Sequence, residues 1–423
     1  MDYMTAGQAA KKWKISQRRV QILCLENRIL GAFKLGENWA IPINASKPKD
    51  IREKKSSKSS SYKYKVLDLF SGAGGLSRGF LDAGFDVVLG VDFDKTALKT
   101  FEKNHAGSKS MQLDLFNHDN INKIEEYLNK NDIKIDVLVG GPPCQGFSLA
   151  GPRNIKDKRN TLYTAMVEVA SRLKPQAVIL ENVPGLLLLN DGKAAKRIIS
   201  DFKDIGYRMV PKILYAPDYG VPQIRKRVFF VGLLNSKEDF QFPEPIVQPN
   251  HYVTCEEAIG DLPALDGIVG DEIQSYATAP MSEYQKIMRE NSKSVQNHIG
   301  TIHDPKTLKF IAMVPEGKNY RALPDEYKGI YKYHEALTRY HSKKPSNTIN
   351  TGHRSHFHYK WNRIPTVRES ARLQSFPDDF IFYGNKSQQY KQVGNAVPPI
   401  LGCCVAKQLK IYFDSKEVNN EKK

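Results

Sequence analysis

The chain has 423 residues, of which 40% are hydrophobic and 26% are charged, as is ordinary for a globular protein. Its formal net charge of +17 favours a polyanionic partner, with nucleic acid ahead of a membrane surface. The five cysteines form no CxxC pair and no zinc-spaced cluster, and no apolar run reaches the ~18 residues of a membrane span. We therefore expect no disulfide framework, metal site, signal peptide or membrane anchor, and we predict a cytoplasmic protein.

The N-terminal part is the most basic region, because residues 1–65 contain 15 Lys and Arg against 5 Asp and Glu. Thr5 and Ser16 are suited to cap two short helices, and a hairpin pattern follows that turns at residues 36–38. This order resembles a winged helix-turn-helix of the MerR and excisionase type. Arg18 and Arg19 would then contact DNA near the start of the second helix, which enters the major groove. The alternative is a basic helical adaptor that never touches bases.

Composition and pattern divide the chain into five parts. The winged helix-turn-helix over 1–52 is followed by a serine- and lysine-rich linker over 53–63. Strand and helix patterns alternate over 64–234, which predicts a doubly wound, Rossmann-like α/β fold with a mostly parallel sheet between two layers of helices. Residues 235–344, rich in Pro, His and Tyr, break this rhythm and are expected to form a smaller irregular domain. Residues 345–423 return to the α/β domain and end in a frayed tail.

Seven strands are predicted in the α/β part, at 65–70, 86–94, 110–116, 135–139, 176–183, 209–216 and 227–234. Helices are predicted at 75–84, 95–104, 120–131, 161–175, 194–207, 365–376 and 396–413. Parallel strands bring their carboxyl ends to one edge of a sheet, where α/β proteins bind ligands. The loops that follow these strands are therefore the first candidates for a site.

The first of these loops, in DLFSGAGG, is rich in glycine. Gly72, Gly74 and Gly75 permit a tight strand-to-helix turn and a close approach of the backbone to a ligand. The next strand ends at Asp92, a carboxylate able to bind a ribose diol, and Asp114 after the third strand either meets an adenine amino group or caps a helix. The pattern suits NAD, FAD or S-adenosylmethionine, but its spacing departs from GxGxxG and disfavours a dinucleotide.

A second loop, GGPPCQGFS at 140–148, follows the strand at 135–139. Its two prolines lack backbone N–H groups and fix the backbone, so they end the strand and stiffen the loop. Cys144 is thereby held at the end of a strand. It is a candidate nucleophile, although a lone cysteine in a loop is more often inert.

These pieces together resemble the cytosine-C5 DNA methyltransferases. The match covers about residues 65–232 and 345–409, and its elements occur in the family's order: DLFSGAGG, VDFD, LDLF, GGPPCQGFS, ENVPG, PQIRKR, RESARLQSFPDDF and GNAVPP. The resemblance implies a fold that binds S-adenosylmethionine and a reaction on a cytosine flipped out of duplex DNA. It also places residues 235–344 at the family's target-recognition position.

The resemblance further implies how the reaction proceeds. Cytosine C5 is a poor nucleophile, and a thiolate that adds to C6 makes C5 enamine-like. Cys144 matches this nucleophile, Glu181 matches the acid that protonates N3, and Arg225 and Arg227 match the residues that hold the cytosine O2. Glu181 must then hold a proton near neutral pH, which burial promotes.

The other residues that the resemblance implies fall into two groups. The cofactor contacts are Phe70, Gly72, Ala73, Gly74, Gly75, Asp92, Phe93, Asp114, Leu115, Pro143, Leu162, Asn395 and Ala396. The DNA contacts are Gln145, Ser148, Arg153, Lys158, Arg159 and Thr348, with Arg18 and Arg19 of the N-terminal part. Core packing is the alternative for Phe70 and Phe93, and a structural role is the alternative for Asn395 and Thr348. Asp92 stands where the family more often has Glu, and Ala396 where a serine is frequent, which removes one hydroxyl from the pocket.

We therefore predict a DNA cytosine-C5 methyltransferase with a monomeric, nucleoid-associated catalytic part, whose partners are double-stranded DNA and a restriction endonuclease acting on the same site. The N-terminal domain would also allow the chain to regulate transcription of its own operon. Two alternatives stay open, an RNA (tRNA) cytosine-C5 methyltransferase and a non-enzymatic DNA-binding regulator. A nicotinamide oxidoreductase is disfavoured, because hydride transfer does not need a Pro-Pro-Cys-Gln loop.

Overall fold

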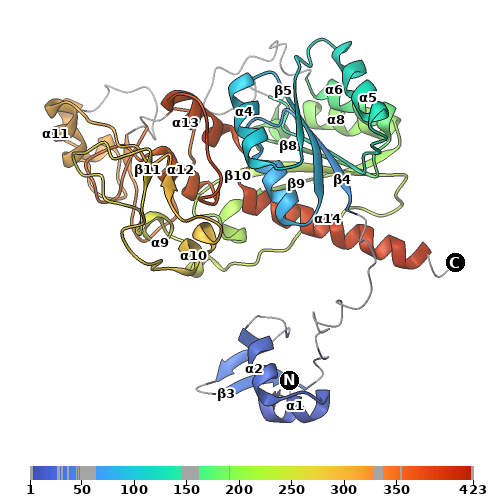
Figure 1. The fold of residues 1–423 in the computed structure, drawn as a ribbon, viewed down its shortest axis with the longest axis horizontal. Helices are drawn as coiled ribbons and strands as arrows, with labels where there is room; N and C mark the ends of the chain where they lie inside the picture. Colours follow the sequence, from blue (N-terminus) through green and yellow to red (C-terminus); the bar gives the residue numbers. More distant parts are fainter. Residues whose placement is uncertain are drawn as a thin grey trace. The chain divides into compact units, whose positions relative to one another are not determined.

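The protein separates into two compact units, Met1–Tyr62 and Lys63–Lys423, and each has its own hydrophobic core (Figure 1). The computed structural model describes residues 3–25, 29, 32–35, 38–43, 45, 47, 63–143, 162–189, 191–327, 337–352 and 355–420. No helix within these ranges is long and apolar enough to cross a membrane.

The N-terminal unit consists of two helices and a three-stranded antiparallel sheet. Its elements are β1 (Tyr3–Thr5), α1 (Ala6–Trp13), α2 (Gln17–Leu25), β2 (Phe33–Leu35) and β3 (Asn38–Pro42), and the strand order is β1-β3-β2. Thr5 caps α1 with a capping box, and the Ser16 hydroxyl accepts a hydrogen bond from the Arg19 N–H at the start of α2. The two predicted helices and the hairpin are confirmed as elements.

Seven strands form the mixed sheet of the larger unit. In spatial order they are β6 (Lys109–Gln112), β5 (Asp86–Asp92), β4 (Lys65–Leu69), β7 (Val137–Gly140), β8 (Ala177–Asn182), β10 (Lys226–Leu234) and β9 (Tyr207–Tyr215). The first five strands are parallel, and β10 runs antiparallel to both of its neighbours. The connection from β9 to β10 contains no α-helix, as suits an antiparallel pair, whereas parallel neighbours need a crossover.

Helices cover both faces of the sheet (Figure 1). Successive strand residues point to opposite faces, so Val66 and Phe229 belong to one core while their neighbours Leu67 and Phe230 belong to the other. The first core is covered by α3 (Gly75–Asp82), α4 (Lys95–Asn104) and α14 (Pro399–Asn420), and the second by α5 (Asn120–Lys130), α6 (Tyr163–Leu173) and α8 (Lys193–Asp204). Because both faces of the central strands are buried, β7 (VLVG) and β8 (AVILEN) are almost continuous apolar runs, whereas the outer strands β6 and β9 include exposed polar residues.

The described residues of 235–344 form short elements, the longest of them nine residues. They are η5 (Pro249–His251), α9 (Cys255–Ile259), β11 (Ile273–Gln274), α10 (Glu283–Arg289), β12 (Val295–Gln296), α11 (Pro305–Met313), η6 (Tyr320–Ala322), η7 (Asp325–Tyr327) and β13 (Thr338–Arg339). Strand β13 pairs in parallel with β14 (His356–Phe357), which lies beyond this segment. The remaining elements are α7 (Gly185–Leu188), η4 (Ala216–Tyr219), α12 (Val367–Leu373) and α13 (Lys386–Asn395).

The C-terminal tail differs from its prediction. Residues 415–423 were expected to fray, and this is wrong for 415–420, because α14 continues to Asn420; residues 421–423 lie outside the described ranges. The Tyr64 hydroxyl donates a hydrogen bond of 2.8 Å to Glu417, and Lys416 lies 3.7 Å from the carboxylate of Glu238. These tertiary contacts hold the last turns of the helix, and a sequence pattern does not show them.

Candidate active site

Six strand ends and one strand start meet at a single edge of the sheet. The parallel strands β4, β5, β6, β7 and β8 end there, as does β9, while β10 begins there because it is antiparallel to β8 and β9, with Phe229 opposite Glu181. The loops predicted from the sequence to carry chemistry therefore lie on neighbouring strands. This edge is the place where α/β proteins bind their ligands.

Glu181 and Arg227 form an ion pair at this edge. The distance from Arg227 Nε to Glu181 Oε1 is 2.9 Å, and the two side chains are only 15% and 12% exposed, Arg227 being the more exposed. Burial raises the pKa of Glu181, although the positive charges of Arg227 and Arg225 oppose the rise. The carboxyl group is therefore one that can hold a proton at a higher pH than an exposed glutamate can.

The stem of the Pro-Pro-Cys loop lies beside this carboxyl group. A Cβ atom on Gly141 would come within 3.2 Å of Glu181 Oε2, so the loop backbone runs close to the carboxylate. The amide of Asn182 donates a hydrogen bond of 3.0 Å to the carbonyl of Pro142, which ties the loop to the end of β8. Half-buried Pro143 is the last described residue of the loop. The predicted nucleophile and five predicted DNA contacts lie outside the described residues, namely Cys144, Gln145, Ser148, Arg153, Lys158 and Arg159.

Arg225 has different contacts from those expected. It was predicted to hold the cytosine O2 together with Arg227, but its side chain is buried and both terminal nitrogens donate to other parts of the protein. Nη1 donates to Gln223 Oε1 at 3.3 Å and to the Ile349 carbonyl at 3.0 Å, and Nη2 donates to the carbonyls of Gly394 and Ala396 at 3.0 and 3.1 Å. Arg227, two residues further along, is thus the arginine that faces Glu181.

The glycine-rich loop after β4 takes the strained backbone that its sequence predicts. Phe70, Gly72 and Gly74 have positive φ values of 58°, 53° and 92°. A Cβ atom on Gly74 would lie 2.2 Å from the ring of His105, whereas one on Gly72 would meet nothing within 4 Å. The His105 ring therefore packs against the loop at Gly74. The backbone at Gly72 has no such neighbour, so a ligand can approach it.

His105 supports this loop and was not singled out from the sequence. Its ring nitrogens lie 3.1 Å from the Gly74 carbonyl and 2.7 Å from the Phe101 carbonyl. Burial lowers its pKa to about 4, so the ring is neutral at physiological pH. A lone histidine inside a helical pattern gave no sign of this contact.

Asp92 and Phe93 lie at the end of β5, next to the glycine loop. Asp92 accepts hydrogen bonds of 2.8 Å from the Gly72 and Asp94 N–H groups, one on each carboxylate oxygen, and burial raises its pKa against these bonds. Each oxygen keeps a lone pair for a further donor. The ring of Phe93 is 64% exposed, which is unusual for core packing and leaves a flat face free for an aromatic base.

The other predicted cofactor residues surround the same edge. Asp114 is exposed and accepts a hydrogen bond of 3.0 Å from the Phe116 N–H, and it is not the helix cap proposed as its alternative, since α5 is preceded by Asp119. Ala73, Leu115 and Leu162 are buried. Asn395 is exposed at the end of α13, beside half-buried Ala396.

One polar atom at this edge was missed from the sequence. The hydroxyl oxygen of Ser71, in the middle of the glycine loop, is buried and has no hydrogen-bond partner within the described ranges. A buried orphaned hydroxyl is unfavourable unless a ligand satisfies it. The open backbone at Gly72, the free face of Phe93, the carboxylate of Asp92 and this hydroxyl together fit an adenosine-containing ligand with a polar tail. The described part of the chain contains no group of three or more His, Cys, Asp or Glu side chains placed to hold a metal ion.

The remaining predicted DNA contacts are distributed over both units. The Thr348 hydroxyl donates to the Ile224 carbonyl, so it fixes the segment beside Arg225 while its residue stays exposed. Arg18 is exposed and Arg19 half-buried in the first turn of α2, within the N-terminal unit.

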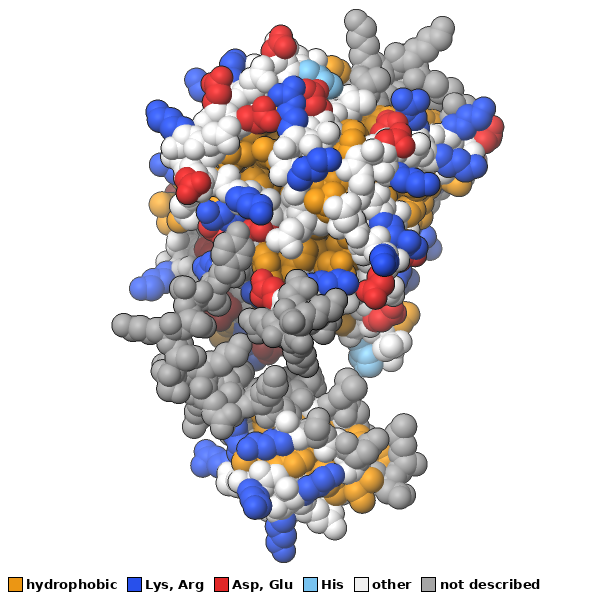
Figure 2. Space-filling view, turned by 90° about the vertical axis from the view of Figure 1, so that its right-hand side faces the viewer, with side chains coloured by type: hydrophobic (Ala, Val, Ile, Leu, Met, Phe, Trp, Pro, Cys, Tyr) orange, Lys and Arg blue, Asp and Glu red, His pale blue; other side chains and the backbone are white. Residues whose placement is uncertain are grey.

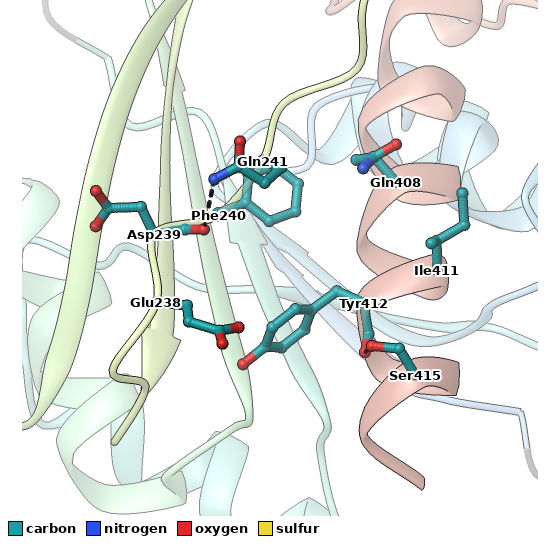
Figure 3. A pocket seen from close by; sticks show the side chains of 8 residues that line it. All are labelled: Glu238, Asp239, Phe240, Gln241, Gln408, Ile411, Tyr412 and Ser415. Carbon is teal, nitrogen blue, oxygen red and sulfur yellow. Dashed lines mark hydrogen bonds between the residues drawn. The ribbon is translucent and has the colours of Figure 1, made fainter. Parts of the chain in front are cut away.

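A shallow pocket elsewhere in the larger unit does not belong to this site. It lies between the segment after β10 and helix α14 (Figure 3), and its lining consists of Glu238, Asp239, Phe240, Gln241, Gln408, Ile411, Tyr412 and Ser415. The segment follows the end of β10, whereas Arg227 is at its start, so the pocket is at the opposite edge of the sheet.

Comparisons with known proteins agree with this geometry. The family described as C-5 cytosine-specific DNA methylase matches residues 64–411, which leaves residues 1–63 outside the match. The chain is 35% identical over 389 residues to the type II methyltransferase M.DdeI of Desulfomicrobium norvegicum, covering 84% of this chain and 91% of that protein. It is 38% identical over 343 residues to the type II methyltransferase M1.HphI of Haemophilus parahaemolyticus, covering 80% and 85%. A crystal structure described as a DNA modification methyltransferase encoded within a prophage (E. coli) superposes with a TM-score of 0.69 at 28% identity, covering 83% of this chain and all of that one.

Proposed function

Since the chain belongs to the family of C-5 cytosine-specific DNA methylases, we propose that it is the modification enzyme of a restriction system. It would transfer a methyl group from S-adenosylmethionine to C5 of a cytosine within a specific duplex site. The observation that carries the proposal is the buried Glu181–Arg227 pair, 2.9 Å apart beside the stem of the Pro-Pro-Cys loop. In this assignment residues 64–234 and 345–423 form the catalytic domain, and 235–344 form the target-recognition domain.

The cofactor would bind in the pocket formed by the glycine loop and the end of β5. Phe93 would stack on the adenine, Asp92 would accept from the ribose hydroxyls, and the Gly72 and Ser71 region would receive the polar methionyl end. Asp114, Leu115, Pro143, Leu162, Asn395 and Ala396 would complete the walls. When bound, S-adenosylmethionine supplies the electrophilic methyl group.

The residues of the chain would then activate the cytosine. The Cys144 thiolate adds to C6, and the electron pair of the C5–C6 bond is shifted toward C5 and N3. Glu181, whose pKa burial raises, donates a proton to N3, and the Arg227 guanidinium holds O2 and keeps the acid in place. After C5 has gained its methyl group, the C5 proton is lost to solvent, the thiolate is expelled from C6, and N3 returns its proton to Glu181, which restores the neutral aromatic ring and the acid.

The target must leave the duplex before this chemistry can occur, because its C6 is not accessible within a base stack. Gln145, Ser148, Arg153, Lys158 and Arg159 belong to the predicted loop that would close over the DNA. Thr348, exposed beside the start of β10, would contact a backbone phosphate.

Bisulfite sequencing of DNA from cells that express the chain tests this function directly. We expect protection of one cytosine in every copy of a short sequence, and no protection in cells expressing Cys144→Ala at the same level. Methylation of duplex DNA and of tRNA by the purified protein, measured side by side, distinguishes a DNA methyltransferase from an RNA methyltransferase. Methylated tRNA with unmethylated DNA would replace the proposal by an RNA methyltransferase, and no methylation of either would leave a non-enzymatic regulator.

We further propose that the N-terminal unit binds duplex DNA, as a winged helix-turn-helix does. Three residues, Lys14 to Ser16, join α1 and α2, which is the short turn of that motif. Val20, Leu23 and Cys24 of α2 are buried against α1, so the opposite side with Arg18 is exposed. Lysine and arginine side chains project from the visible face of this unit (Figure 2), in keeping with the 15 Lys and Arg against 5 Asp and Glu of residues 1–65. Such a unit fits a regulator of the chain's own operon.

A gel-shift experiment tests this second role. The full chain, its Arg18→Ala variant and residues 63–423 are compared on the DNA upstream of the gene. We expect Arg18→Ala and the shortened chain to lose the shift while keeping methyltransferase activity. Equal binding by residues 63–423 would show that the N-terminal unit is an adaptor without a DNA role.

A further inference from the structure

Arg225 joins three segments that are far apart in the sequence. Its two terminal nitrogens reach four acceptors: Gln223 in the segment that leads into β10, Ile349 in the segment that returns from the insert, and the carbonyls of Gly394 and Ala396 at the end of α13. The side chain is 1% exposed, so these bonds are shielded from water. A planar guanidinium is the side chain that can hold several acceptors in a fixed relative geometry.

The first of these segments belongs to the base side of the site. Gln223 accepts from the Ile349 N–H at 3.0 Å, and the Ile224 N–H donates to the Ser346 carbonyl at 2.8 Å, so residues 223–224 and 346–349 run together. Arg227, two residues after Arg225 on the same chain, pairs with Glu181. A displacement of this segment would therefore move the guanidinium that faces the target base.

The third segment belongs to the cofactor side. Gly394 and Ala396, whose carbonyls Arg225 holds, flank Asn395, one of the predicted cofactor contacts. A Cβ atom on Gly75 would lie 2.5 Å from the Val397 carbonyl and 3.0 Å from the Ala396 side chain. The glycine loop and residues 394–397 are thus in direct packing contact, and neither can shift alone.

We propose that Arg225 is a positioning residue that couples the cofactor pocket to the base pocket. The proposal rests on the proposed methyltransferase function. When the cofactor orders residues 394–397 and the glycine loop, Arg225 transmits that order to the start of β10 and to Arg227. The cytosine then binds to residues that are already in position. Because coupling between two binding sites is reciprocal, a bound cytosine also strengthens cofactor binding. Arg225 does this without touching either ligand.

The coupling is measured as the ratio of two dissociation constants. S-adenosylhomocysteine, which cannot donate a methyl group, is titrated by calorimetry into the full chain alone and into the chain with a duplex carrying the mapped site. For a coupled enzyme we expect DNA to tighten binding by about 5-fold to 150-fold. In Arg225→Lys, whose single ammonium cannot span the four acceptors, the ratio should fall toward 1.

Arg339→Lys is the matched control. Arg339 is also buried and donates to the carbonyls of Ile311, Val314 and His358, but these lie within and beside the insert and connect neither pocket. This variant should lose stability and keep the wild-type ratio. An unchanged ratio in Arg225→Lys, with both affinities weakened alike, would reduce Arg225 to a structural residue and overturn the proposal.

A measurement on the wild-type chain covers the case in which Arg225→Lys does not fold. In hydrogen exchange, S-adenosylhomocysteine alone should protect the amides of residues 223–227 and 346–350 as well as those near the glycine loop. Protection confined to residues 70–75 and 394–397 would contradict the coupling. Failure of the wild-type chain to methylate DNA would instead remove the proposed function, so the two failures are distinguishable.

Discussion

Two buried glutamate–arginine pairs in this protein behave in opposite ways. Glu181 at the sheet edge receives Arg227 Nε on one oxygen at 2.9 Å, and burial raises its pKa. Glu369 of α12 receives both terminal nitrogens of Arg363 at 2.7 Å and the Thr366 N–H at 2.7 Å. Burial would raise the pKa of Glu369 too, but the charge of Arg363, with smaller contributions from neighbouring histidines, moves it well below its usual range.

The difference lies in how many donors each carboxylate has. A carboxylate with a full set of donors stays charged and fixes the structure, whereas one with a single side-on donor can take up and release a proton. The same contrast holds nearby: the two terminal nitrogens of Arg372 donate to backbone and carboxylate oxygens, while the Ser71 hydroxyl of the glycine loop has no partner among the described residues. Orphaned buried polar atoms are not confined to the site, because Arg225 Nε, Gln392 Oε1 and Trp13 Nε1 also lack a partner among the described residues. Ser71 differs from them in its place beside the open backbone at Gly72.

Glu181→Gln gives the largest effect expected from this comparison. The amide cannot supply an acidic proton to N3, so methyl transfer should fall by about 10²-fold to 10⁴-fold. Burial raises the pKa of Glu181, so its charged form contributes less to stability than that of Glu369, and the thermal midpoint should fall less than in Glu369→Gln even though Arg227 loses its counter-charge. Single-turnover methylation and a thermal melt on one preparation measure both. Wild-type activity in this variant would show that Glu181 is only a partner for Arg227.

Glu369→Gln should show the reverse pattern. It leaves the guanidinium of Arg363, whose side chain is 4% exposed, buried without a counter-charge. Breaking such a pair lowers the free energy of unfolding by about 3–5 kcal/mol. Urea unfolding at pH 7 measures the loss, and the activity per folded molecule should change far less than in Glu181→Gln. If Glu369→Gln is as stable as the wild type, the number of hydrogen-bond donors around a carboxylate does not distinguish a structural glutamate from one in the active site.

The buried histidines make the stability of the folded protein depend on pH. Burial lowers the pKa of His105 and His356 to about 4 and that of His358 to about 3, and it lowers that of His298 as well. The unfolded chain binds protons near pH 6.5 and the folded chain does not, so stability should fall as the pH drops from 6.5 toward 4. Each histidine contributes up to about 1.4 kcal/mol per pH unit in this window. Equal stability at pH 7 and pH 5 in denaturant titrations would contradict the assignment of these rings as neutral.

Ser71→Ala should have the smallest effect of these variants. It tests whether a hydroxyl without a partner belongs to the ligand site, as a carboxylate with few donors does. Its oxygen loses no bond in the ligand-free protein, so stability should not fall, while S-adenosylhomocysteine should bind about 3-fold to 10-fold more weakly, the equivalent of one hydrogen bond. Ser77→Ala is the matched control, because the Ser77 hydroxyl donates a 2.6 Å bond to buried Asp68. Ser77→Ala should lose stability. If the two variants are equally stable, the Ser71 hydroxyl does not differ from a hydrogen-bonded hydroxyl in the folded protein.

The sequence predicted the strands and the residues at their ends because both leave local patterns. Apolar runs located all seven strands, and the glycine and proline loops located the edge that holds Glu181 and Asp92. Helix α13 was not predicted, since its sequence is largely polar and only its capping box and tertiary packing define it. The roles of Arg225 and Arg227 could not be separated either, because Arg225 meets segments more than a hundred residues away while Arg227 meets Glu181 on a neighbouring strand, and only the tertiary structure shows this difference.

The atoms that matter most to the comparison were hidden for the same reason. A serine in a glycine-rich loop reads as an ordinary turn residue, and only the packing around Ser71 reveals a buried hydroxyl without a partner. His105 likewise lies within a helical pattern, and its contact with Gly74 joins residues 31 positions apart. The periodicity of apolar residues predicts helices and strands. Whether a polar group finds a hydrogen-bond partner depends on the tertiary structure.

The proposed reaction requires the thiolate of Cys144 to bond to C6 of a target cytosine. The most direct measurement uses a duplex in which 5-fluorocytosine replaces the mapped cytosine, since fluorine cannot leave as the C5 proton does. With S-adenosylmethionine present, we predict a complex of wild-type chain and DNA that survives denaturing electrophoresis and is absent with Cys144→Ala. An equally stable complex with Cys144→Ala, or none with an active wild-type chain, would contradict the account.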